Sequence, residues 1–130
     1  MKRWLEQFSE FLYAIMRLVV GLLFACHGAQ KLFGVLGGVS QLSNPLMLTA
    51  GIIEFGGGLL VALGLWSRYA AFIASGEMAV AYFLVHASKN FFPILNKGEL
   101  AVLYCFVFLF IASKGSGKWS VEQLMGTQKN

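Results

Sequence analysis

Four long apolar runs constrain this sequence more than any other feature. They cover about residues 8–33, 46–66, 69–87 and 100–113. A helix needs roughly 20 apolar residues to cross a hydrocarbon layer about 30 Å thick. The chain is 58% hydrophobic and only 12% charged, whereas soluble domains are roughly one-quarter charged. The runs therefore predict an all-α fold: one integral membrane domain over residues 1–130, built as a bundle of four transmembrane helices.

The positions of lysine and arginine predict how this bundle is oriented. With four spans, the N-terminus, the turn at residues 67–68 and the tail at 114–130 share one side of the membrane. That side carries Lys2, Arg3, Arg68, Lys114, Lys118 and Lys129, and the other side carries Lys31, Lys89 and Lys97. Cytoplasmic segments are the richer in Lys and Arg, so we expect both termini to be cytoplasmic.

The net charge of +4 does not indicate a nucleic-acid partner. The lysines lie mainly at the ends of apolar runs, where they extend toward the membrane surface. The expected partner is the lipid membrane. Within the tail, Ser120 is expected to cap one short interfacial helix, with Trp119 as its anchor.

Ionisable side chains inside the runs indicate where the helices enclose a polar site, since such groups usually face the bundle interior. A rise of about 1.5 Å per residue gives Arg17 and Glu77 a similar depth near the inner side. We expect them to form a structural ion pair. The same count gives His27 and Glu54 a similar depth in the outer half, where they form a second candidate pair within a candidate ligand and proton site. Its residues are His27, Lys31, Glu54, Gln30, Glu99 and His86.

Some of these residues also have a purely structural interpretation, so the sequence assigns no catalytic residue. Lys31 fits equally well as a lysine that extends to the surface, and Glu99 and His86 fit an interfacial position. Small residues on the helix faces allow close helix packing. The packing glycines that we expect are Gly21, Gly28, Gly51 and Gly58.

The two cysteines, Cys26 and Cys105, come out at similar depth in their runs. A redox pair is geometrically possible, although a buried free cysteine commonly acts as a small hydrophobic residue. The sequence contains no metal-ligand spacing and no flavin, nicotinamide or iron–sulfur motif. His27 and His86 differ in depth by several residues, which disfavours a pair of axial haem ligands.

Three stretches of this chain, in order, resemble the DoxX family. "RLVVGLLFACHGAQKLFG" at residues 17–34 resembles its opening signature of Arg, a glycine four residues later, and His-Gly-x-x-Lys. "GIIEFGGGLLVALGLWSR" at 51–68 resembles its Gly-x-x-Glu-x-x-Gly-Gly run. "GSGKWSVE" at 115–122 is similar to its closing Gly-Pro-Gly-Arg-x-Ser-Leu-Asp, with Ser116, Lys118 and Glu122 as departures.

The resemblance implies a four-helix protein of the bacterial cytoplasmic, or inner, membrane. The family takes its name from a small subunit of a thiosulfate:quinone oxidoreductase, and other members are tied to quinone or catechol detoxification. It therefore implies a possible link to quinone chemistry without supplying a mechanism. The motif positions that it carries over are Arg17, His27, Gly28, Lys31, Glu54 and Glu99.

Three functions stay open at this point. The leading hypothesis is a redox-linked subunit that binds a quinone in the outer polar pocket, with electrons from a soluble or membrane partner, a bound quinol or the cysteine pair. The second is a non-enzymatic anchor or assembly partner for a soluble redox enzyme. The third is a small-solute or proton transporter acting as a homo-oligomer, although broken helices typical of many transporters are not evident.

Overall fold

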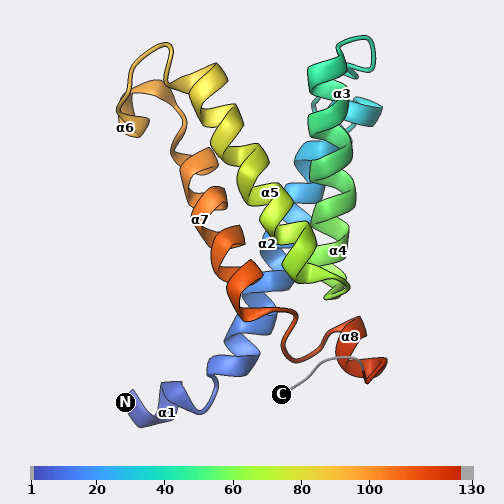
Figure 1. Ribbon diagram of the computed structural model, residues 1–130, viewed down its shortest axis with the longest axis vertical. Helices are drawn as coiled ribbons and strands as arrows, with labels where there is room; N and C mark the ends of the chain where they lie inside the picture. The colour runs from blue at the N-terminus through green and yellow to red at the C-terminus, as the bar shows by residue number, and fades with distance from the viewer. Residues whose placement is uncertain (1, 127–130) are drawn as a thin grey trace.

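The fold is helical over the whole described part of the chain. The computed structural model describes residues 2–126, and within them it contains helices and no strand. The elements, shown in Figure 1, are α1 (Lys2–Glu6), α2 (Ser9–Phe33), α3 (Pro45–Ile52), η1 (Ile53–Gly57), α4 (Gly58–Leu63), α5 (Ser67–Ala81), η2 (Tyr82–His86), α6 (Pro93–Asn96), α7 (Glu99–Lys114) and α8 (Val121–Leu124). The two η elements are π-helical segments that continue α3 and α5 without a break.

Among residues 2–126, three of the continuous helices are long and apolar enough to cross a membrane. They run over Ser9–Phe33, Pro45–Leu63 and Ser67–His86, with 25, 19 and 20 residues. The prediction of an all-helical protein with membrane-spanning helices is thus confirmed. The fourth predicted span forms α7, whose 16 residues give a helix about 24 Å long at 1.5 Å per residue. The count of four spans and the orientation stay predictions.

The helices pack as two pairs. α2 lies along the continuous helix α3–η1–α4, and α5 lies along α7. The pairs meet where α5 contacts α4 and η1. Figure 1 shows the elements close together at the end that carries α1 and α8, while α3 and α6 lie well apart at the opposite end.

Glycine residues allow α2 to pack closely along the helix α3–η1–α4. A Cβ atom on Gly21 would lie 2.5 Å from the backbone nitrogen of Ala62, and one on Gly28 would lie 2.2 Å from that of Phe55. Gly58 and Gly51 also face α2, where a Cβ would meet atoms at 2.6 Å and 2.9 Å. The backbones of α2 and its partner are therefore in direct contact, as small residues allow in membrane helices.

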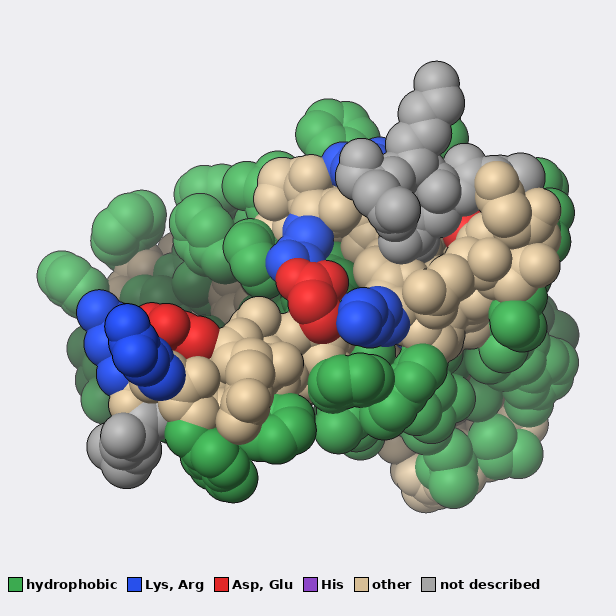
Figure 2. All heavy atoms as spheres, turned by 90° about the horizontal axis from the view of Figure 1, so that it is seen from below, with side chains coloured by type: hydrophobic (Ala, Val, Ile, Leu, Met, Phe, Trp, Pro, Cys, Tyr) green, Lys and Arg blue, Asp and Glu red, His purple; other side chains and the backbone are tan. Residues whose placement is uncertain are grey.

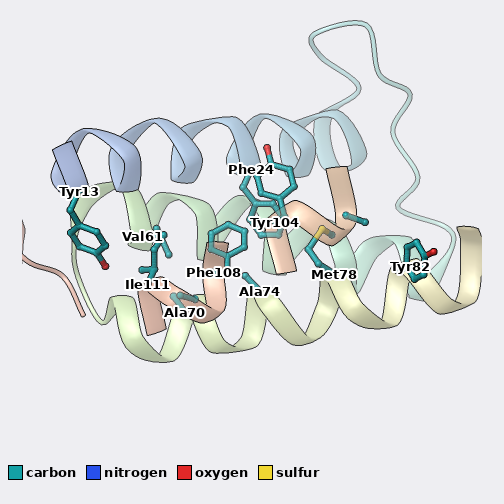
Figure 3. Close-up of a cluster of buried hydrophobic side chains, with 12 residues drawn as sticks. Tyr13, Phe24, Val61, Ala70, Ala74, Met78, Tyr82, Tyr104, Phe108 and Ile111 are labelled. Carbon is teal, nitrogen blue, oxygen red and sulfur yellow. The ribbon is translucent and has the colours of Figure 1, made fainter. Parts of the chain in front are cut away.

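The core lies between the two pairs and combines aromatic rings with small and aliphatic side chains (Figure 3). The ring centroid of Phe24 on α2 is 5.2 Å from that of Tyr104 and 4.6 Å from that of Phe108, both on α7. Ala71 and Ala74 on α5 are fully buried, so the small side chains of α5 let α7 pack closely. This packing joins α2 to α7 across the molecule.

The tail after α7 folds back under the bundle. The Tyr13 hydroxyl donates to the carbonyl of Gly115 at 2.6 Å, and the hydroxyls of Ser116 and Ser67 are 2.9 Å apart. The predicted short helix is confirmed as α8, where the Ser120 hydroxyl accepts from the Gln123 amide at 3.1 Å. Seen from this end, Lys, Arg and acidic side chains lie exposed among hydrophobic ones (Figure 2).

The predicted ion pair between Arg17 and Glu77 is wrong. Arg17 is 1% exposed, and its Nη2 donates to the carbonyl of Trp119 at 2.9 Å. It therefore holds the tail, and Glu77 lies on a face of α5 that is turned to a different site, described below. The depth count placed both residues at one level, but depth does not say which way a side chain points around its helix.

Candidate functional site

A cavity of about 580 Å³ lies between the two helix pairs in the half of the molecule away from α1 and α8. Ligand pockets in proteins typically enclose about 300–1,000 Å³. Side chains from α2, α3, η1, α5, η2 and α7 line it, and most of them are apolar. The ionisable lining residues are His27, Lys31, Glu54, Glu77, His86, Lys97 and Tyr104.

An ion pair between Lys31 and Glu54 forms part of the cavity wall. Lys31 Nζ is 2.6 Å from Glu54 Oε2, and the two side chains are 24% and 3% exposed. Charge-assisted contacts of this length are among the stronger hydrogen bonds in proteins. The partner predicted for Glu54 was His27, so this is a correction: Lys31 lies one helical turn further along α2 and reaches the carboxylate with its longer side chain.

Local sequence signals position both members of this ion pair. Gly34 ends α2 in a left-handed conformation, with φ at +67°, so Lys31 lies in the last turn. Glu54 lies in η1, and single π-helical turns recur at functional sites in proteins. The helix that presents Glu54 begins at Pro45, and the Asn44 side chain accepts from the Leu46 amide at 3.1 Å.

Glu77 completes a cluster of two carboxyl groups and one ammonium group. It lies beside Glu54 and within electrostatic range of Lys31. Its Oε2 atom is buried without a hydrogen-bond partner. Buried polar atoms are nearly always satisfied, and an exception calls for an explanation such as a water or a ligand. Glu77 therefore belongs to the cavity wall beside Glu54 and Lys31.

Two histidines, His27 and His86, also line the cavity. The ring of His27 lies edge-on to that of Tyr104, with centroids 6.1 Å apart. His86, in η2, has its Nδ1 3.1 Å from the carbonyl oxygen of Asn96. Either ring can donate or accept a hydrogen bond, depending on its tautomer.

Asn96 was missed in the sequence, although it organises the loop above the cavity. It is 3% exposed. Its amide nitrogen donates to the hydroxyl of Tyr82 at 3.0 Å and to the carbonyl of Asn90 at 2.6 Å, and its side-chain oxygen accepts from the Gly98 amide at 2.7 Å. The sequence feature that could have indicated this role is the position of the asparagine, three residues after Pro93 in a loop of exposed aromatic residues.

Two residues assigned to the site lie outside it. The Gln30 side chain donates to the carbonyl of Leu36 at 2.9 Å and so holds the loop after α2. Glu99 is exposed in the first turn of α7. Neither side chain lines the cavity. Helical periodicity explains the first case, because Gln30 and Lys31 point about 100° apart around α2.

The two cysteines do not form a pair. Both thiols are free: Cys26 is exposed, and Cys105 lies half-buried with its sulfur 3.5 Å from the Ser75 hydroxyl. Among residues 2–126, no three His, Cys, Asp or Glu side chains gather in a way that could hold a metal ion.

The fold and the site define a small helical membrane protein with an ionisable cluster in an apolar cavity. The sequence model of the DoxX family matches residues 12–87, which is more than half of the 130-residue chain. The chain belongs to the DoxX family, and it is an integral membrane protein of the bacterial inner membrane.

Two relatives support this assignment. An uncharacterized protein of Haemophilus influenzae is 41% identical over 125 residues, covering 91% of this chain and 93% of the relative. The inner membrane protein YqjF of Escherichia coli is 28% identical over 121 residues, covering 85% of this chain and 89% of YqjF. No solved structure matches the chain significantly.

Proposed function

We propose that this protein is a redox-linked membrane subunit that binds a quinone-like molecule in the cavity beside Lys31 and Glu54. It crosses the membrane four times with both termini in the cytoplasm, so the cavity lies in the outer half of the bilayer. One observation carries the proposal: Lys31, Glu54 and Glu77 meet in the wall of an otherwise apolar cavity of about 580 Å³.

The cluster suits a flat ring with oxygen atoms at opposite edges. An ammonium group and an imidazole donate hydrogen bonds to ring oxygens, while the apolar walls contact the ring faces. Reduction of a quinone to a quinol consumes two electrons and two protons. The carboxyl groups of Glu54 and Glu77 pass on the protons, and a partner redox protein, soluble or membrane-bound, supplies the electrons.

A purely structural role explains this arrangement less well. A buried ion pair contributes little net stability after its desolvation. The second carboxyl group adds cost, because Glu77 lies beside the carboxyl group of Glu54 and its Oε2 atom is buried without a hydrogen-bond donor. A ligand hydroxyl or a transferred proton would satisfy that oxygen, which favours a binding site.

The test is to purify the protein in mild detergent and quantify the quinones extracted from it by mass spectrometry. Wild type is expected to carry close to one quinone per protein. Glu54→Gln is expected to bind at least about ten-fold more weakly, since a lost hydrogen bond to a charged group costs about 1.5–3 kcal/mol. Glu99→Gln is the matched control, because Glu99 lies outside the cavity. Equal quinone content in all three proteins would overturn the proposal.

The second candidate function is an anchor for a soluble redox enzyme, and the exposed apolar side chains of the tail favour it. Trp119, Leu124 and Met125 are 63%, 89% and 58% exposed. Under this alternative, Leu124→Ser/Met125→Ser abolishes co-purification of a redox enzyme and Glu54→Gln leaves it unchanged. The reverse pattern would support the quinone site.

A further inference from the structure

We infer that the cavity opens sideways into the lipid between α3 and α5, so that its ligand enters from the membrane and keeps an apolar chain in this opening. This inference rests on the proposed function for the ring of the ligand. It adds the class of ligand: a lipid-soluble quinone with a long hydrocarbon chain, taken up from within the bilayer.

Side chains that line the cavity and are exposed at the same time mark the opening. Leu46 on α3 is 55% exposed, and Ile73, Val80 and Leu84 on the helix α5–η2 are 55%, 54% and 58% exposed. Leu100, in the first turn of α7, also lines the cavity and is 50% exposed. Side chains that do both are expected at a rim where the cavity reaches the molecular surface. That surface belongs to the spans Pro45–Leu63 and Ser67–His86, so it faces hydrocarbon.

The opening is long enough to hold the hydrocarbon chain of the ligand. Ile73 and Leu84 are eleven residues apart, which is about 16 Å along a helix at 1.5 Å per residue. Glu77 lies between them on the same helix. A ring held at the polar cluster therefore has apolar wall on both sides of it along α5, and its chain can leave the cavity without crossing a polar surface.

Contact between the hydrocarbon chain of the ligand and these side chains adds little to the affinity, because lipid tails are as apolar as the side chains. The hydrocarbon chain contributes by concentrating the ligand in the bilayer. The opening leaves room for this chain when the ring is bound. A cavity closed to the lipid would accept the ring and reject the chain. The two cases differ in how affinity changes with chain length.

The experiment uses the full chain in phosphatidylcholine nanodiscs and two probes with one ring: 2,3-dimethoxy-5-methylbenzoquinone, and the same ring with a decyl chain. Affinities come from ligand-induced shifts of thermal unfolding, since a ligand of the native state stabilises it by RT ln(1 + [L]/Kd). Ile73→Trp fills the opening. Phe72→Trp is the matched control, because Phe72 is exposed on α5 outside the cavity lining.

In wild type, we expect the decyl compound to bind at least as tightly as the chainless ring at equal concentration in the membrane. We expect Ile73→Trp to weaken binding of the decyl compound by about ten-fold, or 1.4 kcal/mol. Binding of the chainless ring is expected to stay unchanged. Binding of the ring without binding of the decyl compound would overturn the inference alone. So would an equal loss of both ligands in Ile73→Trp. Failure of both ligands to bind wild type would overturn the proposed function as well.

Discussion

At the scale of single residues, Gly28 decides how closely Lys31 and Glu54 can approach each other. It lies one turn before Lys31, and a side chain at this position would run into the backbone of Glu54 and Phe55. Backbone atoms cannot swing aside as a flexible side chain would. The glycine in the His-Gly-x-x-Lys stretch is therefore part of the site as well as of the helix packing.

Gly28→Ala is expected to lower the free energy of unfolding by about 1–3 kcal/mol, the usual cost of overpacking, and to weaken ligand binding by moving η1 away from α2. Gly76→Ala is the control, because a Cβ there meets nothing within 4 Å. Thermal unfolding in detergent compares the two. Equal stability of both variants would contradict the close packing of α2 against η1.

The ion pair predicts a particular pattern of stabilities. Glu54→Gln leaves the Lys31 charge without its partner, so it is expected to destabilise the protein by about 3–5 kcal/mol. Lys31→Gln/Glu54→Gln removes both charges and is expected to recover part of this loss. Chemical denaturation of the single and double variants measures the coupling.

The control for this double-mutant cycle is the exposed pair of Lys114 and Glu10, whose charged atoms are 3.0 Å apart. Exposed pairs contribute about 0–1 kcal/mol, so a much smaller coupling is expected there. Similar coupling energies for the two pairs would mean that Lys31 and Glu54 are not buried together.

At the scale of elements, hydropathy predicted where the membrane helices lie, because a long apolar run has few alternatives. The runs at 8–33, 46–66 and 69–87 correspond to helices over Ser9–Phe33, Pro45–Leu63 and Ser67–His86. Hydropathy could not predict η1 and η2, because a π turn depends on packing against a neighbour. It also could not predict which face of α5 carries Glu77 into the cavity.

The tail illustrates a second limit. Its short helix could be predicted from Ser120, but its docking could not, because the contacts join residues far apart in sequence. The amide of Trp66 donates to Glu122 Oε1 at 2.5 Å, and the Glu122 amide donates to the carbonyl of Gly64 at 3.1 Å. Arg17 adds its bonds to the tail from α2. The three stretches that resemble the family thus meet at one place.

Arg17→Met is expected to release the tail, because the buried guanidinium holds the carbonyls of Lys118 and Trp119. Limited trypsin digestion should then cut after Lys118 at least about ten-fold faster, since proteolysis follows the population of the open form. Arg3→Met, in exposed α1, is the control. Unchanged cleavage in Arg17→Met would show that Arg17 does not hold the tail.

At the scale of the whole molecule, α1 and α8 lie at one end (Figure 1), and the side chains that line the cavity come from the opposite half of the long helices. This arrangement fits an even number of membrane crossings. The charge rule for membrane proteins predicts that the α1–α8 end, with its excess of Lys and Arg, lies in the cytoplasm. In the proposed orientation, the cavity faces the outer leaflet.

Labelling of single cysteines tests this orientation. In a Cys26→Ala/Cys105→Ala background, Ser88→Cys lies in the loop before α6 and Leu124→Cys lies in α8. A thiol reagent that cannot cross membranes should label position 88 in intact spheroplasts and label position 124 only after lysis. Labelling of both positions before lysis would exclude an even number of crossings.

The measurement that tests the central claim most directly is to map where a photoreactive azidoquinone attaches in native membranes. Mass spectrometry of the labelled peptides is expected to find the label on cavity-lining residues such as Ile53 and Met78, and Glu54→Gln is expected to reduce it. Label confined to the outward face of α2, at Leu18 and Leu22, and unchanged in Glu54→Gln would contradict the claim that the cavity is a quinone site.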